Sequence, residues 1–418
     1  MKTTQKVPPP LCPLPQGEGS YEKGTFSKSG FGIQNEGCIC GKRKIIITEG
    51  AEDKMGKRYF GHIEVPLKRI HIELTNICDF NCVFCPKSAM ERPYGYMDTK
   101  LAKSIIDEIQ KNKLCDKITF HVMGEPTLHP DFFEILSYAH DKGAKVGLTT
   151  NGSRLGGETG KRLLDCNLHQ IDISLQTPDA KSFVLRKANA LTFDSYLSGI
   201  LNFFSSYMAR RRGTVFKFRF LNTRFPQKNI EKKAGPVRVM SSTEELRDTF
   251  SCWADRIYDI LGVESEKREK AIRRIKSLVS YKWNVVEIYP DVFFETYMLE
   301  DWGHAFDIGK VYNAWAGYCF GMRDHFSILH NGDVVLCCVD FNGRTKVGNL
   351  NNSSLKEVLS SNELGEIMRG FKKFRLMHPY CKRCLGSSSI FSWLLKPVMS
   401  ITVLKTLKPF FYKRTKVF

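Results

Sequence analysis

The chain has 418 residues, of which 42% are hydrophobic and 26% are charged. These fractions exclude a wholly disordered or collagen-like protein, and the length predicts two or three domains. The net charge of +19 favours an anionic partner, although charge alone does not define a fold or require nucleic acid. The 14 cysteines carry more information, because their spacing separates a disulfide framework from a metal protein.

The two ends of the chain differ in character. Residues 1–63 are rich in Pro, Gly, Ser and Lys and predict a poorly ordered segment; translation could begin at Met55. We see no apolar core of a secretory signal and no apolar run long enough to span a membrane, so we expect a cytoplasmic protein. Residues 386–418 form a basic, apolar tail that either contacts a membrane surface peripherally or packs over the body. Pro397 and Pro409 are expected to break any long helix there.

Residues 64–290 predict an α/β domain, because short apolar runs alternate with amphipathic segments. The pattern favours a partial (β/α)6 barrel. Asp98 and Asp131 are expected to begin helices, and Gly143 follows a helix as its left-handed terminating residue. The expected strands are 70–74, 118–122, 145–149, 170–175, 216–221 and 284–288. The expected helices are 98–112, 131–142, 156–166 and 193–209, with two more near 243–261 and 265–280 in an insertion.

Polar motifs follow the first four predicted strands. They are the cysteine loop 78–85, the segment 123–126 (Met-Gly-Glu-Pro), Asn151 before a glycine, and Ser174 within the fourth strand. Because the carboxyl ends of parallel strands meet at one rim, we expect these motifs to converge there.

Cys78, Cys82 and Cys85 are spaced C-x3-C-x2-C on a polar loop. Thiolates are soft ligands that suit zinc or an iron–sulfur cluster. A structural zinc would need a fourth ligand, and no Cys or His follows before Cys115. The spacing therefore favours a cluster with one iron left open.

This loop, with Phe84 before its last cysteine, resembles the radical S-adenosylmethionine (SAM) enzymes. The resemblance implies a [4Fe–4S] cluster on the three cysteines, whose open iron binds SAM, and cleavage of SAM to a 5′-deoxyadenosyl radical that abstracts a substrate hydrogen. It further implies that an external low-potential donor supplies the electron. The implied SAM-binding residues are Gly124, Glu125, Asn151, Ser174 and Arg186. Met123 stands where the family usually has a glycine. No residue is assigned a catalytic proton transfer.

A second set of cysteines lies in residues 291–385. His325 to Cys337 reads as two strands around an Asn-Gly turn, which brings Cys337 back toward Cys319, and a helix is expected near 354–370 before Cys381 and Cys384. Four thiolates suit either zinc or a fully ligated [4Fe–4S] cluster. The spacing C-x12-G-x4-C followed by C-x2-C resembles the SPASM/Twitch extensions of radical SAM enzymes. That resemblance implies a small α+β extension with one auxiliary [4Fe–4S] cluster.

The pattern of one auxiliary cluster after a six-repeat core resembles the inosamine dehydrogenases of aminoglycoside biosynthesis. It implies an oxidoreductase-type reaction on a polar small molecule, with electron transfer through the auxiliary cluster. A radical SAM maturase that acts on a peptide or protein is the first alternative. A zinc-stapled nucleic-acid-binding protein is the second, although no recognisable nucleic-acid-binding motif is present, so we expect no nucleic-acid partner.

Overall fold

The computed structural model describes residues 56–407, except 211–212, 226, 300–301 and 308. Most of the segment expected to be poorly ordered, residues 1–55, and the end of the basic tail, residues 408–418, lie outside the described residues. Near the start of the described residues, two short strands, β1 (Arg58–Phe60) and β2 (Ile63–Val65), pair antiparallel.

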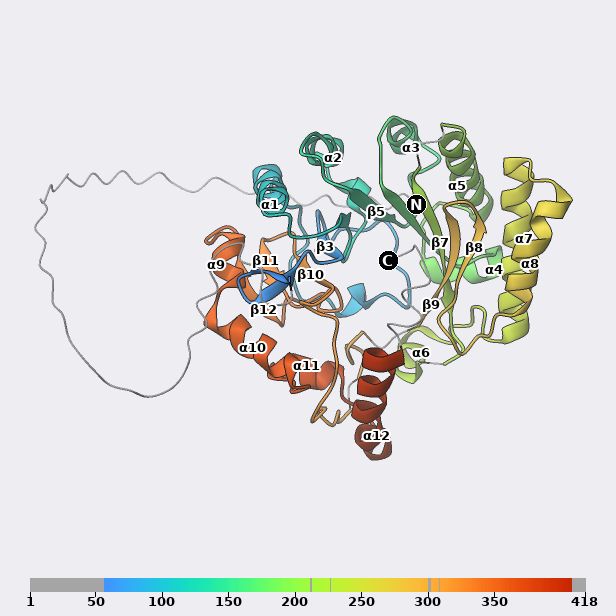
Figure 1. Cartoon of the computed structure of the whole chain (residues 1–418). Helices are drawn as coiled ribbons and strands as arrows, with labels where there is room; N and C mark the ends of the chain where they lie inside the picture. The colour runs from blue at the N-terminus through green and yellow to red at the C-terminus, as the bar shows by residue number, and fades with distance from the viewer. Residues whose placement is uncertain (1–55, 211–212, 226, 300–301, 308, 408–418) are drawn as a thin grey trace, which may run out of the picture. The chain divides into compact units, whose positions relative to one another are not determined.

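A ten-stranded sheet forms the centre of the protein, in the order β12-β11-β10-β3-β4-β5-β6-β7-β9-β8 (Figure 1). Six neighbouring parallel strands build the partial barrel, so the expected α/β class is confirmed. These strands are β3 (Arg69–Ile72), β4 (Ile118–Phe120), β5 (Val146–Thr150), β6 (Gln170–Gln176), β7 (Val215–Asn222) and β9 (Val292–Met298).

The last barrel strand is not the one that the sequence predicts. The expected sixth strand corresponds to β8 (Val285–Tyr289), which runs antiparallel to β9 at the sheet edge, whereas β9 pairs in parallel with β7. The prediction is wrong because β8 has the apolar alternation of a strand but is followed by a tight hairpin at Pro290 and Asp291. Residue 290, the expected end of the barrel domain, lies in that turn.

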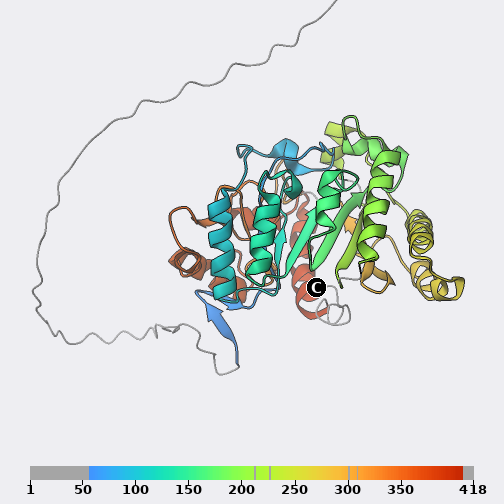
Figure 2. The same cartoon turned by 90° about the horizontal axis from the view of Figure 1, so that it is seen from above.

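Helices cover one face of the parallel strands (Figure 2). In α1 (Thr99–Lys111), buried residues at helical spacing face the sheet. The carboxylate of Asp98 accepts a hydrogen bond from the Leu101 amide and caps the start of α1, as expected. Asp131 precedes α2 (Phe132–Asp141) but makes no capping bond; its carboxylate instead accepts from the Thr99 hydroxyl at 2.6 Å. Gly143 follows α2 with φ +74°, as expected.

The remaining barrel helices are α3 (Glu158–Leu163), α4 (Ala180–Phe183), α5 (Phe193–Met208), α6 (Lys228–Ala234), α7 (Thr243–Leu261) and α8 (Ser265–Lys276).

The C-terminal extension joins the barrel through its own strands. β10 (His325–Ile328) pairs in parallel with β3, and β11 (Asp333–Val335) and β12 (Lys346–Asn349) continue the sheet as antiparallel strands. The helix expected near 354–370 is two helices, α9 (Leu355–Leu359) and α10 (Asn362–Lys372), because Ser354 and Ser361 each cap a new helix start. α11 (Pro379–Cys384) follows.

The described part of the tail forms α12 (Ile390–Ile401), which continues as a π-helical turn over Thr402–Leu407. Pro397 lies inside α12, so the expectation that it breaks the helix is wrong. Proline removes one backbone donor and strains the preceding turn, yet the helix continues on both sides of it. Within the described residues, no helix combines the length and the apolar character needed to cross a bilayer.

Candidate iron–sulfur and SAM site

The three-cysteine loop leaves the carboxyl end of β3 and folds back over the barrel rim. The Lys87 ammonium donates hydrogen bonds to the carbonyl oxygens of Cys78 at 2.9 Å and Phe80 at 3.3 Å. Phe80 and Phe84 are buried and anchor the loop, whereas the three cysteine residues are half-buried. The loop is therefore shaped by the protein, with its sulfur ligands held on a fixed backbone.

Burial controls the acidity of these thiols. It raises the pKa of Cys78 to about 11 and the pKa of Cys85 to about 12, with smaller contributions from neighbouring acidic groups and thiols. Protonated thiols are poor ligands, so metal binding here must release protons.

Gly124 and Glu125 pack directly against the start of this loop. Gly124 has φ +73°, and a Cβ atom on it would lie 2.3 Å from the carbonyl oxygen of Thr75. The Glu125 amide donates to the Ile77 carbonyl at 2.8 Å. Only glycine fits this close approach, so the structure explains why Gly124 stands here although Met123 replaces the family's first glycine.

The Glu125 carboxylate is buried and joins two strand ends. It accepts hydrogen bonds from the hydroxyl groups of Thr127 at 2.7 Å and Thr150 at 2.9 Å, and from the Asn151 amide at 2.6 Å. Burial raises the pKa of Glu125, and the hydrogen bonds oppose that shift. The carboxylate is thus fixed next to the cysteine loop in a site of low polarity.

Asn151 contacts the cysteine loop with its side chain. Its amide group lies 3.5 Å from the Cys78 sulfur and donates to the Asp79 carboxylate at 2.7 Å. The other carboxylate oxygen of Asp79 accepts from the Ser153 hydroxyl at 2.6 Å. The turn at the end of β5 and the cysteine loop are therefore one connected unit.

Ser174 and Arg186 meet at the carboxyl end of β6. The Arg186 guanidinium is buried and donates to the carbonyl oxygens of Ser174 at 2.7 Å and Leu175 at 2.6 Å. It lies over the Phe80 ring, 4.6 Å from the centroid, and its Nε atom has no hydrogen-bond partner. The family resemblance implies that Arg186 binds the SAM carboxylate, and its Nε is a buried donor that no described protein group uses.

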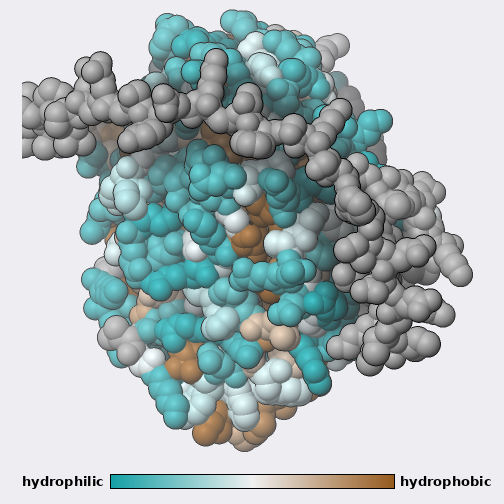
Figure 3. All heavy atoms as spheres, turned by 90° about the vertical axis from the view of Figure 1, so that its left-hand side faces the viewer, coloured by the Kyte–Doolittle hydropathy of each residue, from teal (hydrophilic) through white to brown (hydrophobic). Residues whose placement is uncertain are grey.

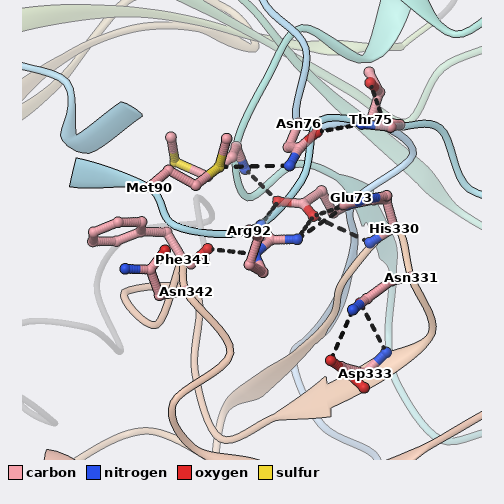
Figure 4. Close-up of polar contacts among 12 residues, drawn as sticks. Glu73, Thr75, Asn76, Met90, Arg92, His330, Asn331, Asp333, Phe341 and Asn342 are labelled. Atoms are coloured by element: carbon pink, nitrogen blue, oxygen red, sulfur yellow. Dashed lines mark hydrogen bonds and ion pairs between the residues drawn. The ribbon is translucent and has the colours of Figure 1, made fainter. Parts of the chain in front are cut away.

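Sequence reasoning missed a buried carboxylate at the same rim. Glu73 follows β3 directly and forms a two-bond ion pair with Arg92, at 2.8 and 2.9 Å (Figure 4). It also accepts from the backbone amides of Met123 at 3.2 Å and His330 at 3.1 Å. Glu73 thus ties the segment after the cysteine loop, the Gly124 loop and the C-terminal extension together. Its place directly after a buried strand is the signal that could have identified it.

The four cysteines of the extension also converge. Burial raises the pKa of Cys337, and electrostatic interaction with the thiols of Cys319 and Cys384 raises it further. The pKa of Cys381 is raised by burial and by the same two thiols. A Cβ atom on Gly321 would lie 3.5 Å from the Cys319 sulfur, and one on Gly303 would lie 3.2 Å from the Cys384 sulfur. The backbone therefore leaves space around the sulfur atoms.

Comparison with protein families identifies both regions. Residues 72–215 match the model described as the radical SAM superfamily, and residues 319–385 match the model, SPASM, described as an iron–sulfur cluster-binding domain. The chain therefore contains a radical SAM domain and a SPASM domain. The two matched regions are the ones that contain the three-cysteine loop and the four converging cysteines.

Similar proteins cover only part of this chain. The cofactor-modifying protein for the tungsten-containing aldehyde ferredoxin oxidoreductase of Pyrococcus furiosus is 30% identical over 32% of this chain and 36% of its own length. The mycofactocin maturase MftC of Mycobacterium tuberculosis is 36% identical over 26% of this chain and 27% of its own. The chain thus spans about a third of the length of the curated relatives it matches. Among solved structures, SuiB of Streptococcus suis bound to S-adenosylmethionine gives a TM-score of 0.47 at 16% identity, over 74% of this chain and 69% of that one.

The residues present fit the cofactors that the family implies, namely a SAM-binding [4Fe–4S] cluster and auxiliary iron–sulfur binding. Three thiols on a shaped loop leave a cluster iron for an external ligand, and four thiols complete a second centre. The backbone cradle at Gly124 and the unused Nε of Arg186 provide room and a donor beside the first centre.

Proposed function

We propose that the protein cleaves SAM reductively and abstracts a hydrogen atom from a polar substrate. The observation that carries this proposal is the convergence of the three-cysteine loop with Glu125, Asn151 and Arg186 at one rim. When bound, the first cluster supplies the electron that cleaves SAM into methionine and a 5′-deoxyadenosyl radical. An external low-potential donor would replace that electron.

The protein's own residues would bind, orient and shield the reactants. Glu125 would face the ammonium group of SAM, because its carboxylate is fixed beside the cluster loop. Arg186 would use its remaining donor on the SAM carboxylate, as a charge-assisted hydrogen bond. The buried rings of Phe80 and Tyr196 would exclude water from this contact, since both lie near the guanidinium.

We assign the substrate to a polar, anionic small molecule. Charged side chains lie among the apolar residues of β6, β7 and β9. The guanidinium of Arg219 pairs with the carboxylates of Asp172 at 2.9 Å and Glu295 at 3.1 Å. Lys117 and Lys217 add two mostly buried ammonium groups nearby, and burial lowers the pKa of both. These three cations face two carboxylates, so an anionic group on a substrate that enters the barrel from the rim would balance the remaining charge. After the hydrogen atom is removed, the substrate radical would lose a proton and give its second electron to one auxiliary cluster, which Cys319, Cys337, Cys381 and Cys384 would hold.

A peptide maturase is the second candidate, and the similarity to the mycofactocin maturase MftC favours it. The radical SAM domain leaves the nucleic-acid-binding alternative without support. A cytoplasmic location stays a prediction.

Replacing Cys381 by alanine tests whether the two cysteine groups bind separate clusters. We expect the iron content of anaerobically reconstituted protein to fall from about eight to about four atoms per chain, because one four-iron cluster is lost. SAM cleavage should persist, because the three-cysteine loop is unchanged. Iron analysis and chromatography of 5′-deoxyadenosine measure the two effects. Cys252→Ala, an exposed cysteine on α7, is the matched control and should keep all of the iron. Full iron content in Cys381→Ala would contradict the assignment.

The helix α12 is the feature that would carry peripheral membrane contact. Large apolar side chains along it are exposed, Phe391 to 75% and Met399 to 61%. Apolar atoms gather at the lower end of the face in Figure 3, which is the level of α12 in Figure 1. We expect the protein to sediment with vesicles that contain an anionic lipid, and Phe391→Ser with Met399→Ser to weaken that binding at least about tenfold. Equal sedimentation of both proteins, or none with the unchanged protein, would show that α12 has another role.

A further inference from the structure

A third cluster of metal-ligating side chains lies beside the four-cysteine group and includes Cys338, the residue after Cys337. The Nε or Nδ atoms of His71 and His325 and the sulfur of Cys338 all lie within 4.8 Å of one another. His71 is on β3 and His325 on the neighbouring β10. His325 pairs with Arg69 and His71 with Ser327, so the two histidines are two residues apart in register and share one face of the sheet. Their rings pack edge to face at 5.3 Å.

The spacing of the ligand atoms suits a tetrahedral metal ion. The Cys338 sulfur lies 3.7 Å from Nε2 of His325. In a tetrahedral zinc site with Zn–S of about 2.3 Å and Zn–N of about 2.0 Å, sulfur and nitrogen ligands are about 3.5 Å apart. Zinc could therefore enter between these two ligands with little movement of either residue.

His71 is prepared as a ligand by its neighbour Thr119. Nδ1 of His71 lies 2.6 Å from the Thr119 hydroxyl oxygen, and that hydroxyl can donate its own hydrogen to the Ile70 carbonyl at 3.5 Å. With the Thr119 hydroxyl hydrogen on the Ile70 carbonyl, Nδ1 of His71 carries the ring hydrogen and Nε2 presents its lone pair. Metal-binding histidines commonly have such a donor contact on their second nitrogen.

The Nε2 atom of His71 is aimed into the cluster without a hydrogen-bond partner in the described part of the chain. The side chain is only 5% exposed, so water does not replace the missing partner at the surface. A buried polar atom left without a partner calls for an explanation, and a bound ion supplies one.

From these contacts we propose that His71, His325 and Cys338 bind one Zn²⁺ ion. Cys338 binds as the thiolate, whose negative charge offsets the cationic Arg69 beside the histidines. Cys337, the preceding residue, belongs to the four-cysteine group, so two consecutive cysteines serve two different centres. Three protein ligands leave a fourth position that water or an oxygen or nitrogen atom of a substrate can occupy.

Zinc analysis of the protein with both iron–sulfur centres reconstituted tests this proposal. After dialysis against a low-micromolar zinc buffer under anaerobic conditions, we expect about one zinc per chain in addition to the iron. Zinc X-ray absorption should show one sulfur ligand at about 2.3 Å and nitrogen ligands at about 2.0 Å. His71→Phe and Cys338→Ser should each lose the zinc and keep the iron, whereas Cys252→Ser should keep both.

Three results would overturn the proposal. They are the absence of zinc from the unchanged protein, zinc that persists in Cys338→Ser, or loss of iron rather than zinc in Cys338→Ser. The last result would make Cys338 a cluster ligand. Because Cys338→Ser replaces a single half-buried sulfur atom by oxygen, it gives an answer even if His71→Phe does not fold.

Discussion

Arg92→Met is expected to lower the free energy of unfolding by about 3–5 kcal/mol, because it leaves the buried Glu73 carboxylate without its ion-pair partner. Both side chains are buried, and the guanidinium also donates to the Phe341 carbonyl at 2.7 Å in the extension (Figure 4). The loss should therefore loosen the contact between the cysteine loop and the extension. Urea denaturation of the reconstituted protein, followed by fluorescence, measures the effect.

The exposed ion pair between Arg344 and Glu91 provides the matched control, because it connects the same two segments at 2.6 Å. Arg344→Met should change stability by less than about 1 kcal/mol, since water screens an exposed pair. Burial alone would raise the pKa of Glu73, but His330 and Arg92 outweigh it and lower that pKa. The stabilisation should therefore be complete at neutral pH and fade only as the pH falls through the lowered pKa. Equal losses in the two variants would contradict this account.

Gly124→Ala is expected to weaken SAM binding by at least about tenfold, or about 1.4 kcal/mol. The added Cβ atom would lie 2.3 Å from the Thr75 carbonyl and 2.7 Å from the Ile77 carbonyl, so the start of the cysteine loop must shift. That shift would move the cysteine loop relative to Glu125, whose amide donates to the Ile77 carbonyl. Calorimetric titration of the reconstituted protein with SAM under anaerobic conditions gives the dissociation constant.

Gly143→Ala separates this clash from backbone strain. Gly143 has almost the same φ, +74°, but a Cβ atom there meets nothing within 4 Å. Gly143→Ala should lower the stability by roughly 1–2 kcal/mol, because alanine is strained in the left-handed conformation. It should leave SAM affinity unchanged. If Gly124→Ala binds SAM as tightly as Gly143→Ala does, the close approach is not required for the site.

The sequence predicts most of the barrel because parallel strands buried on both faces are apolar runs, and their helices carry apolar residues at regular spacing. The first five strands and α1, α2, α5 and α7 lie within two or three residues of their predicted positions. The prediction fails at β8 and β9, since an edge strand and a central strand have the same local pattern and differ only in their pairing.

The two cysteine groups could be recognised from the sequence because their spacing is local, and their role as cluster ligands stays a prediction. The contacts made by Glu73 could not be recognised, because its partners Arg92 and His330 lie 19 and 257 residues away along the chain. The same holds for His71 and Cys338, which the pairing of β3 with β10 brings into one cluster. Contacts across strands depend on the sheet order, which no single segment encodes.

The central claim is that the three-cysteine loop, Glu125 and Arg186 form a site for reductive SAM cleavage. The most direct measurement is the formation of 5′-deoxyadenosine by anaerobically reconstituted protein with SAM and dithionite. The account predicts turnover by the unchanged protein and by Cys252→Ala. Cys82→Ala should lose both the turnover and about four of its iron atoms per chain. No 5′-deoxyadenosine from protein that carries its full iron content, or equal amounts from Cys82→Ala, would contradict it.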